Sequence, residues 1–145
     1  IYCEQEFKKL DFQTKQINWT ITNETGTLRG LHYQPNQAKI VRCVSGSIFD
    51  AIIDIRKESE TYGQHFCTVL NDSEPGCALY VPPGCAHGFQ CLTKQATVMY
   101  FASEYYNKTT EGGISWNDPA FNIHWPHPPK KISRRDQNFD WRTNV

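Results

Sequence analysis

The sequence lacks three features that would each point to a particular class of protein. It contains no apolar stretch near the roughly 20 residues that a membrane-spanning helix needs. Its 15 Lys and Arg residues balance its 15 Asp and Glu residues, and no Lys/Arg run exceeds two residues. It also lacks a Gly-rich dinucleotide-binding fingerprint. We therefore expect no membrane span, no nucleic-acid surface and no bound dinucleotide cofactor.

Disulfide bonding and secretion also have little support. The six cysteines form no CxxC pair, and a chain of 145 residues can bury a sizeable core without disulfides. Four Asn-x-Ser/Thr sequons would suit a secreted glycoprotein, but the first residues lack the charged and apolar regions of a signal peptide. We expect reduced cysteines in a soluble, cytoplasmic protein whose single domain covers residues 1–145.

The apolar residues predict an all-β fold. They recur in short β-branched runs separated by Gly, Pro, Asn and Asp, at residues 39–44, 47–55, 64–70, 78–81, 88–92 and 96–102. Strands of this length and spacing are typical of a sandwich or closed roll, which removes unpaired sheet edges. A short helix is expected at residues 5–10. The tail after Ser103, with Trp116, Trp125 and Trp141, is expected to pack over the barrel as irregular coverage.

The segment at residues 27–34, TLRGLHYQ, is the most informative one. On an extended strand His32 and Gln34 point to one face, and Leu31 and Tyr33 point to the other. A buried histidine with a carboxylate partner can act as a general base, and the nearby Lys39 can stabilise negative charge on an oxygen. The segment by itself also fits an ordinary surface strand.

A second segment, VPPGCAHGF at residues 81–89, places His87 after a Pro/Gly turn and resembles the second motif of the cupin superfamily. Metal-binding cupins carry His-x-His and a glutamate on an earlier strand. Here that stretch reads His32-Tyr33-Gln34, so the ligand set is incomplete and we expect no metal. A metal-dependent cupin using His32 and His87 stays open as an alternative.

Two further stretches, taken alone, have ordinary structural interpretations. Tyr100 ends an apolar strand, where a structural tyrosine is the ordinary interpretation. The residues around Glu111, and the SRRD segment that contains Arg135 and Asp136, read by composition as loops with a helix-cap or turn aspartate.

Together these segments resemble the dTDP-4-dehydrorhamnose 3,5-epimerase family. The resemblance runs from about residue 16 to residue 136, through GTLRGLHYQ, KIVR, FD, DIR, PGCAHGF, YY, WNDP, WP and SRRD in that order. It implies a cupin-type jelly roll with short peripheral helices, a homodimer, and a site that uses no metal and no cofactor. The substrate that it implies is a nucleotide-diphosphate sugar with a 4-keto group.

The resemblance also implies roles for individual residues. His32 matches the catalytic base, Asp136 its carboxylate partner, Tyr100 the proton donor and Lys39 the group beside the ketone oxygen. The residues implied in binding the nucleotide and sugar are Gln16, Asn18, Arg29, His87, Glu111 and Arg135. Two arginines suit a diphosphate. The proposed chemistry needs no redox cofactor, because the ketone acidifies the protons at C3 and C5 and accepts the electrons.

Three departures from the family pattern leave alternatives open. The resemblance implies a further N-terminal strand that contributes to substrate binding and the dimer, and this sequence starts beyond it, either because it is truncated or because this is a short variant. Arg135 stands where a lysine is expected, and Phe101 follows Tyr100 where a lysine is common. The expected reaction converts dTDP-4-dehydro-6-deoxyglucose to dTDP-4-dehydrorhamnose. The alternatives are a single-site 3- or 5-epimerase acting on a dTDP-, CDP- or GDP-sugar, and a non-catalytic protein that binds sugar nucleotides.

Overall fold

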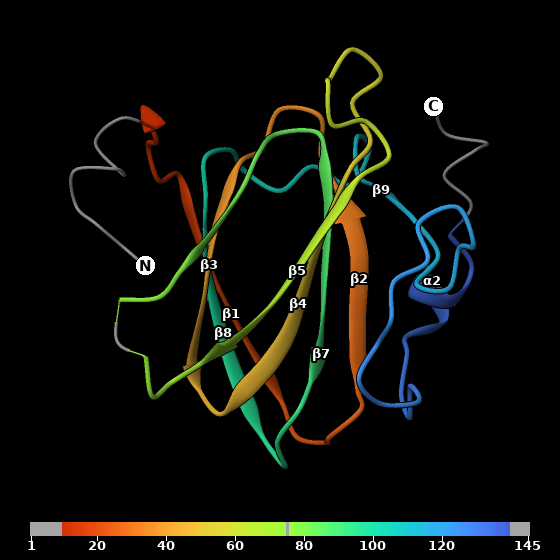
Figure 1. The fold of residues 1–145 in the computed structure, drawn as a ribbon. Coiled ribbons are helices and arrows are strands. Elements are labelled where there is room, and N and C mark those ends of the chain that lie inside the picture. The colour runs from red at the N-terminus through yellow and green to blue at the C-terminus, as the bar shows by residue number, and fades with distance from the viewer. Residues whose placement is uncertain (1–9, 75, 140–145) are drawn as a thin grey trace.

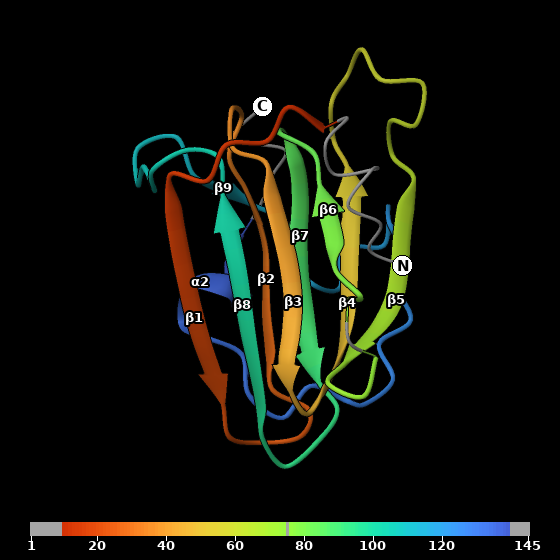
Figure 2. The same cartoon turned by 90° about the vertical axis from the view of Figure 1, so that its left-hand side faces the viewer.

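The computed structural model describes residues 10–74 and 76–139, which form two antiparallel β-sheets packed face to face (Figure 1). One sheet has the order β1 (Gln16–Thr22), β8 (Ala96–Ala102), β3 (Lys39–Ser45) and β6 (Leu79–Val81). The other has the order β5 (His65–Asn71), β4 (Ser47–Asp54), β7 (Cys85–Cys91), β2 (Leu28–Tyr33) and β9 (Gly112–Gly113). Figure 2 shows the first sheet lying in front of the second. The predicted all-β jelly roll is confirmed.

Most predicted strands lie within a residue or two of the observed ones, and β8 matches at both ends. The largest shift is in β7, which begins at Cys85 instead of residue 88. The strands β1 and β9 and the short helix α2 (Arg134–Gln137) lie outside the predicted elements. The apolar residues of β1 are exposed, whereas the apolar residues of a strand usually face the core. The helix expected at residues 5–10 falls, except for Leu10, outside the described residues.

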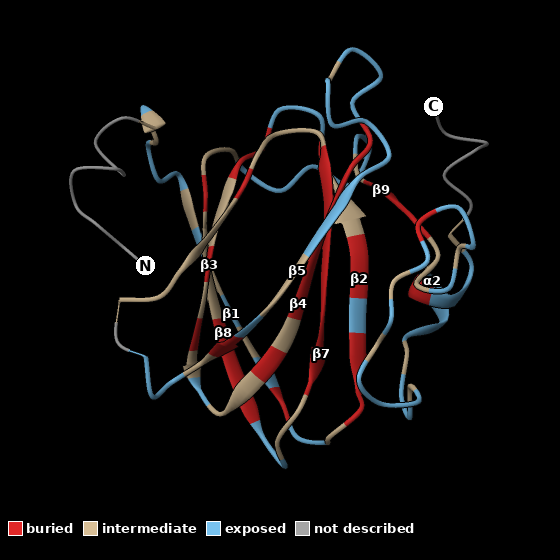
Figure 3. Ribbon diagram, in the orientation of Figure 1, coloured by how far each residue is buried: buried red, intermediate tan, exposed pale blue. Residues whose placement is uncertain are grey.

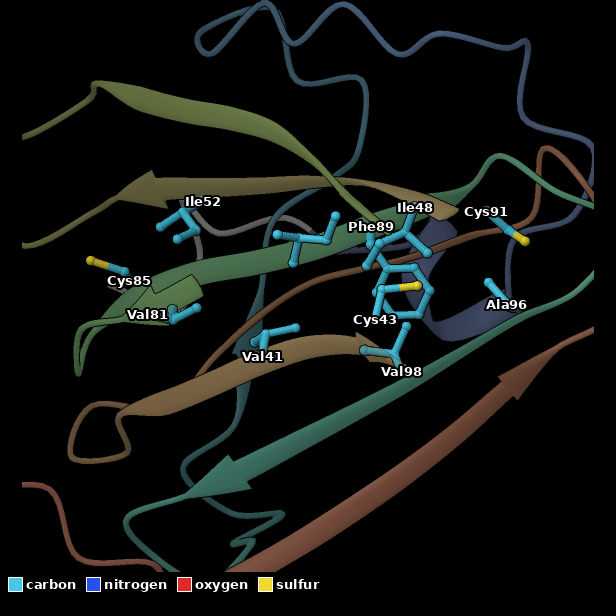
Figure 4. Packing of buried hydrophobic residues seen from close by; sticks show 11 residues of the cluster. Val41, Cys43, Ile48, Ile52, Val81, Cys85, Phe89, Cys91, Ala96 and Val98 are labelled. Atoms are coloured by element: carbon cyan, nitrogen blue, oxygen red, sulfur yellow. The ribbon is translucent and has the colours of Figure 1, made fainter. Parts of the chain in front are cut away.

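The main core lies between the two sheets (Figure 4). Val41 of β3 and Val98 of β8 face Ile48 and Ile52 of β4 and Phe89 of β7, each at most 8% exposed. Alternation along each strand sends these residues inward, and their burial supplies the hydrophobic driving force for closing the roll. In Figure 3 β7 is buried along its length, whereas the edge strand β5 is mostly exposed or half-buried.

The segment that follows β9 covers the outer face of the second sheet, as Figure 1 shows beside β2. Ile114 and Phe121 belong to a second buried cluster on that face. The Trp125 ring meets Phe49 edge to face at 5.6 Å, and its indole N–H donates to the carbonyl of Trp116 over 2.9 Å. The expected irregular coverage is thus confirmed, with Trp141 outside the described residues.

The cysteines of the described chain are free thiols. Cys43, Cys85 and Cys91 are buried, whereas Cys67 and Cys77 are half-buried. Burial raises the pKa of Cys43 and of Cys85 to about 11, so both stay protonated and unreactive at neutral pH. The burial of Cys43, Cys85 and Cys91 fits the expectation of core cysteines, and Cys3 lies outside the described residues. Within residues 10–74 and 76–139, no helix is long and apolar enough to cross a membrane.

Candidate active site

A pocket opens between the two sheets, and side chains predicted from the sequence line it. Its lining includes His32, Lys39, His87, Tyr100 and Arg29, together with Thr20 and Phe89. These residues come from five strands, so the fold gathers them from positions far apart in the chain. The expectation that His32 faces a barrel interior is confirmed.

The pocket walls carry different groups. Tyr100 lies opposite Asn18 in the β1–β8 pair, and Lys39 lies opposite Ala102 in the β3–β8 pair, so these side chains share the inner face of the first sheet. His32 lies opposite His87 in the β2–β7 pair, on the inner face of the second sheet. The two imidazoles therefore lie on one wall of the pocket, and the phenol of Tyr100 and the amine of Lys39 lie on the opposite wall.

An irregularity in β2 gives His32 its direction. The register of the β2–β7 pair shifts between Arg29 and His32, so both residues point inward although three positions apart. Leu31, between them, packs in the cluster on the outer face. Gly30 has φ 118°, and a Cβ there would lie 2.6 Å from Cα of Gly88. Only glycine allows the two strands to approach this closely.

His32 forms a close pair with Asp136 of α2. Its Nε2 atom lies 2.7 Å from Oδ1 of Asp136, across 104 positions of sequence. The helix starts at Ser133, whose hydroxyl accepts the Asp136 backbone N–H, and the Gly30 N–H donates to Oδ2 of Asp136 over 3.2 Å. Burial alone would raise the pKa of Asp136, but the hydrogen bond and charge of His32, with the hydrogen bond from the Gly30 N–H, hold it below its usual value.

This pairing determines which nitrogen of His32 can accept a proton. Since Asp136 is a carboxylate at neutral pH, it can only accept a hydrogen bond, and Nε2 of His32 must carry the hydrogen. In the neutral imidazole the lone pair is then on Nδ1. A histidine oriented in this way, 24% exposed at its side chain and facing a pocket, has the properties of a general base.

Lys39 is half-buried and lines the pocket. Burial lowers the pKa of its ammonium group, while the negative charges of Glu111 and Asp50 act in the opposite direction. A partly desolvated ammonium interacts strongly with a negative charge that develops nearby, because little water screens it.

The predicted binding residues form a network beside the pocket. Arg135 donates from Nη1 to Oε2 of Glu111 over 2.8 Å, and its Nη2 lies 3.2 Å from Nε2 of His32. The Tyr106 hydroxyl donates to the same Glu111 oxygen over 2.8 Å. The Tyr106 backbone N–H donates to the Gln16 side chain, which in turn donates to Asn18. Arg135 is half exposed, so its cation is available to an anionic ligand.

No partner of His87 was predicted from the sequence, and in the structure its partner is Asp50. Both carboxylate oxygens of Asp50 lie about 3 Å from Nε2 of His87, and Asp50 is completely buried. The sequence carried a signal for this pair, because Asp50 interrupts an otherwise apolar strand, IFDAII, and a buried carboxylate requires a partner.

Tyr106, which the resemblance included without a role, and Phe139, which was not predicted, are further residues near His32 and its partners. The Phe139 ring meets the His32 ring edge to face at 5.5 Å and lies against Gly113, where a Cβ would approach it to 2.4 Å. Phe101, adjacent to Tyr100 in sequence, pairs with Ile17 and Ile40 on the outer face. Phe101 in place of a lysine therefore removes no charge from the pocket face, since the side chains of residues 100 and 101 point to opposite faces.

Within residues 10–74 and 76–139, no three His, Cys, Asp or Glu side chains gather in a way that could hold a metal ion. His32 and His87, the two ligands of the alternative metal site, each bond a separate carboxylate.

Comparison with known proteins identifies the family. The family model described as dTDP-4-dehydrorhamnose 3,5-epimerase matches residues 1–142. The chain belongs to this family. A curated dTDP-4-dehydrorhamnose 3,5-epimerase from Salmonella typhimurium is 45% identical over 132 residues, which are 86% of this chain and 70% of the relative. One from Mycobacterium tuberculosis is 44% identical over 115 residues, 77% of this chain and 56% of the relative.

A crystal structure of the dTDP-4-dehydrorhamnose 3,5-epimerase of Bacillus anthracis, with TDP and PPi bound, has the same fold. It superposes with a TM-score of 0.88 at 35% identity and covers 96% of this chain and 82% of that one. The family's members are isomerases, so the resemblance seen in the sequence and its expected enzyme class are confirmed. The roles of individual site residues remain predictions.

Proposed function

We propose that the chain inverts C3 and C5 of dTDP-4-dehydro-6-deoxyglucose and so forms dTDP-4-dehydrorhamnose. The observation that carries the proposal is the position of His32 and Tyr100 on facing sheets of one pocket. Inversion at a carbon requires removal of a proton from one face of the sugar and delivery to the other. A base and an acid on opposite walls meet this requirement.

In the proposed reaction His32 takes the proton from C3 or C5 at Nδ1. The electrons of the broken C–H bond form a double bond to C4, and the ketone oxygen becomes an enolate oxygen. Lys39 stabilises that charge. Tyr100 then donates its proton to the carbon from the opposite face, and the ketone re-forms. One proton leaves and one enters at each carbon, and His32 and Tyr100 return to their starting states by exchange with water.

The proposed ligand is a dTDP-linked sugar, consistent with the TDP bound in the Bacillus anthracis structure. Arg29 lines the pocket and Arg135 lies beside it, and a diphosphate is the group that two guanidinium ions bind well. Gln16, Asn18, Glu111 and His87 are the proposed partners of the remaining polar groups of the nucleotide and sugar.

Product stereochemistry tests the proposed reaction. After incubation with dTDP-4-dehydro-6-deoxyglucose, the mixture is reduced with borohydride and the released 6-deoxy sugars are separated by gas chromatography. Sugars of the L-series inverted at both C3 and C5 are expected. Inversion at C3 alone or C5 alone would establish a single-site epimerase, and unchanged sugar would contradict the proposal.

The substitution Tyr100→Phe tests whether one residue removes the proton from the sugar and another returns it. We expect inversion to fall on the order of 100-fold, because the acid on the far wall is lost. Deuterium from solvent should still enter the substrate, since His32 can return a proton to the face from which it took one. Proton NMR in deuterium oxide follows both processes. Tyr105→Phe, which changes a tyrosine that is 69% exposed, is the matched control. Inversion at the wild-type rate by Tyr100→Phe would refute the role of Tyr100.

We also propose that the chain forms a homodimer through the outer face of the first sheet. Ile17, Trp19 and Ile21 project from this face and are each more than half exposed. Met99 and Phe101 of β8 lie opposite Trp19 and Ile17, so they extend the same apolar surface. An exposed apolar surface over adjacent strands is typical of a protein interface.

Trp19→Glu is expected to convert the dimer into monomers, because it places a charge in the centre of this apolar face. Size-exclusion chromatography with light scattering measures the change in mass. Val69→Glu, which adds the same charge to the exposed strand β5 of the other sheet, should leave the dimer intact. A dimer that persists in Trp19→Glu, or a monomeric wild type, would contradict the proposed interface.

A further inference from the structure

The Asp50–His87 pair is a second histidine–carboxylate pair beside the pocket, and the proposed reaction assigns Asp50 no role. Asp50 is completely buried and lies on the inner side of β4. Its oxygens lie 3.0 and 2.9 Å from Nε2 of His87, which is itself 8% exposed. Burying a carboxylate is costly unless hydrogen bonds or an opposite charge compensate for it, so this pair requires more explanation than a surface contact.

The geometry of this pair repeats that of the first one. His87 lies directly opposite His32 on neighbouring strands, and both imidazoles line the same pocket. In both pairs a carboxylate occupies Nε2, so Nδ1 is the ring nitrogen left for the pocket. Asp50 also acts on Lys39, since its charge favours the ammonium form of that half-buried side chain. Asp50 therefore influences two cationic or potentially cationic groups of the pocket.

We propose that Asp50 is a positioning residue of the epimerase site, which fixes His87 so that its Nδ1–H donates, together with Lys39, to the ketone oxygen of the sugar. This inference rests on the proposed function. Asp50 touches no substrate in this account and acts through His87. This role requires His87 to carry hydrogen on both ring nitrogens, whereas His32 acts with a lone pair on Nδ1. When His32 removes a proton and the ketone oxygen becomes an enolate oxygen, His87 and the ammonium of Lys39 share that negative charge, and the Asp50 carboxylate balances the positive charge of His87.

Asp54 provides a matched control on the same strand. It is also a buried aspartate, at 7% exposure, but it binds Arg56, Ser59 and Thr61 and is not among the residues that line the His32 pocket. Asp50→Asn keeps the size of the side chain and removes its charge, and Asp54→Asn makes the same change at the control site. If the role of Asp50 were only structural, both variants would lower the melting temperature and spare the reaction rate.

We expect Asp50→Asn to slow deuterium incorporation at both C3 and C5 on the order of 100-fold, a loss typical of a group that stabilises developing charge on oxygen. The dissociation constant for dTDP should change by no more than about twofold, because dTDP carries no ketone. Asp54→Asn should exchange at the wild-type rate. Nitrogen-15 NMR should show His87 changing its ring protonation in Asp50→Asn and keeping it in Asp54→Asn.

The double variant Asp50→Asn/His87→Asn removes both partners of the pair, so neither is left buried without the other. It can replace Asp50→Asn in the experiment if that single variant fails to fold. Because Asp50 acts mainly through His87, with Lys39 as a smaller second route, this double variant should be slower than His87→Asn alone by far less than the loss seen in Asp50→Asn. Wild-type exchange in Asp50→Asn, unchanged His87 resonances, or additive losses in the double variant would each overturn the inference while leaving the proposed function intact. A wild-type protein that exchanges no deuterium would overturn the proposed function and this inference together.

Discussion

His32→Ala is expected to lower the rate of deuterium incorporation at C3 and C5 on the order of 1000-fold. The loss is this large because general bases contribute roughly 100- to 10,000-fold, and His32, paired with Asp136 at Nε2, is the proposed base. Binding of dTDP should persist, since the guanidinium groups proposed to bind the diphosphate are unchanged. The measurement is the exchange rate by NMR, with the dissociation constant by calorimetry.

His65→Ala is the control for this variant, because it removes an exposed histidine of the edge strand β5. It should exchange at the wild-type rate. If His32→Ala keeps more than about a tenth of the wild-type rate, another group removes the proton, because so small a loss lies below the range expected of a general base. A variant that binds dTDP but exchanges nothing would fit the proposed role.

Asp136→Asn is expected to cause a loss of similar size, on the order of 1000-fold, although the side chain keeps its shape. An asparagine can donate its amide N–H to Nε2 of His32, and this favours the tautomer with hydrogen on Nδ1. The lone pair then lies on the nitrogen that faces away from the substrate. The loss should appear in kcat with little change in dTDP binding, and the ring nitrogens of His32 should show the exchanged tautomer by nitrogen-15 NMR.

Asp72→Asn, a change at an exposed turn aspartate, is the control for charge removal and should be fully active. Ser133→Ala should cost about 1 kcal/mol of stability through loss of the helix cap, with a smaller effect on rate because Asp136 keeps its charge. An Asp136→Asn protein with near wild-type kcat would show that the carboxylate does not orient His32.

Much of the fold was predictable because most strands carry local signals. The β-branched runs and Gly/Pro turns located β3, β4 and β8 closely. β1 lies outside the prediction because its apolar residues face outward, against the usual assumption that apolar residues mark the core. The helix α2 has four residues and depends on a cap at Ser133 and on packing against β2, and neither gives a helical periodicity in the sequence.

The residues of the candidate site could be predicted from the sequence, but the contacts between them could not. Motif resemblance named His32, Lys39, Tyr100 and Asp136, but the 2.7 Å contact between His32 and Asp136 crosses 104 positions and exists only after the tail folds over the second sheet. Asp50 carried a signal, a carboxylate inside an apolar strand, without indicating its partner. Pairing across strands, and therefore the second histidine–carboxylate pair, follows from sheet register.

The most direct test of the account is mass spectrometry of dTDP-4-dehydro-6-deoxyglucose after incubation with the protein in deuterium oxide. The account predicts a gain of two deuterium atoms, one at C3 and one at C5, because the ketone acidifies both positions and His32 can reach each in turn. A gain of one would limit the reaction to a single carbon. No gain, with the same result on CDP- and GDP-linked 4-keto sugars, would contradict the assignment of this pocket as an epimerase site.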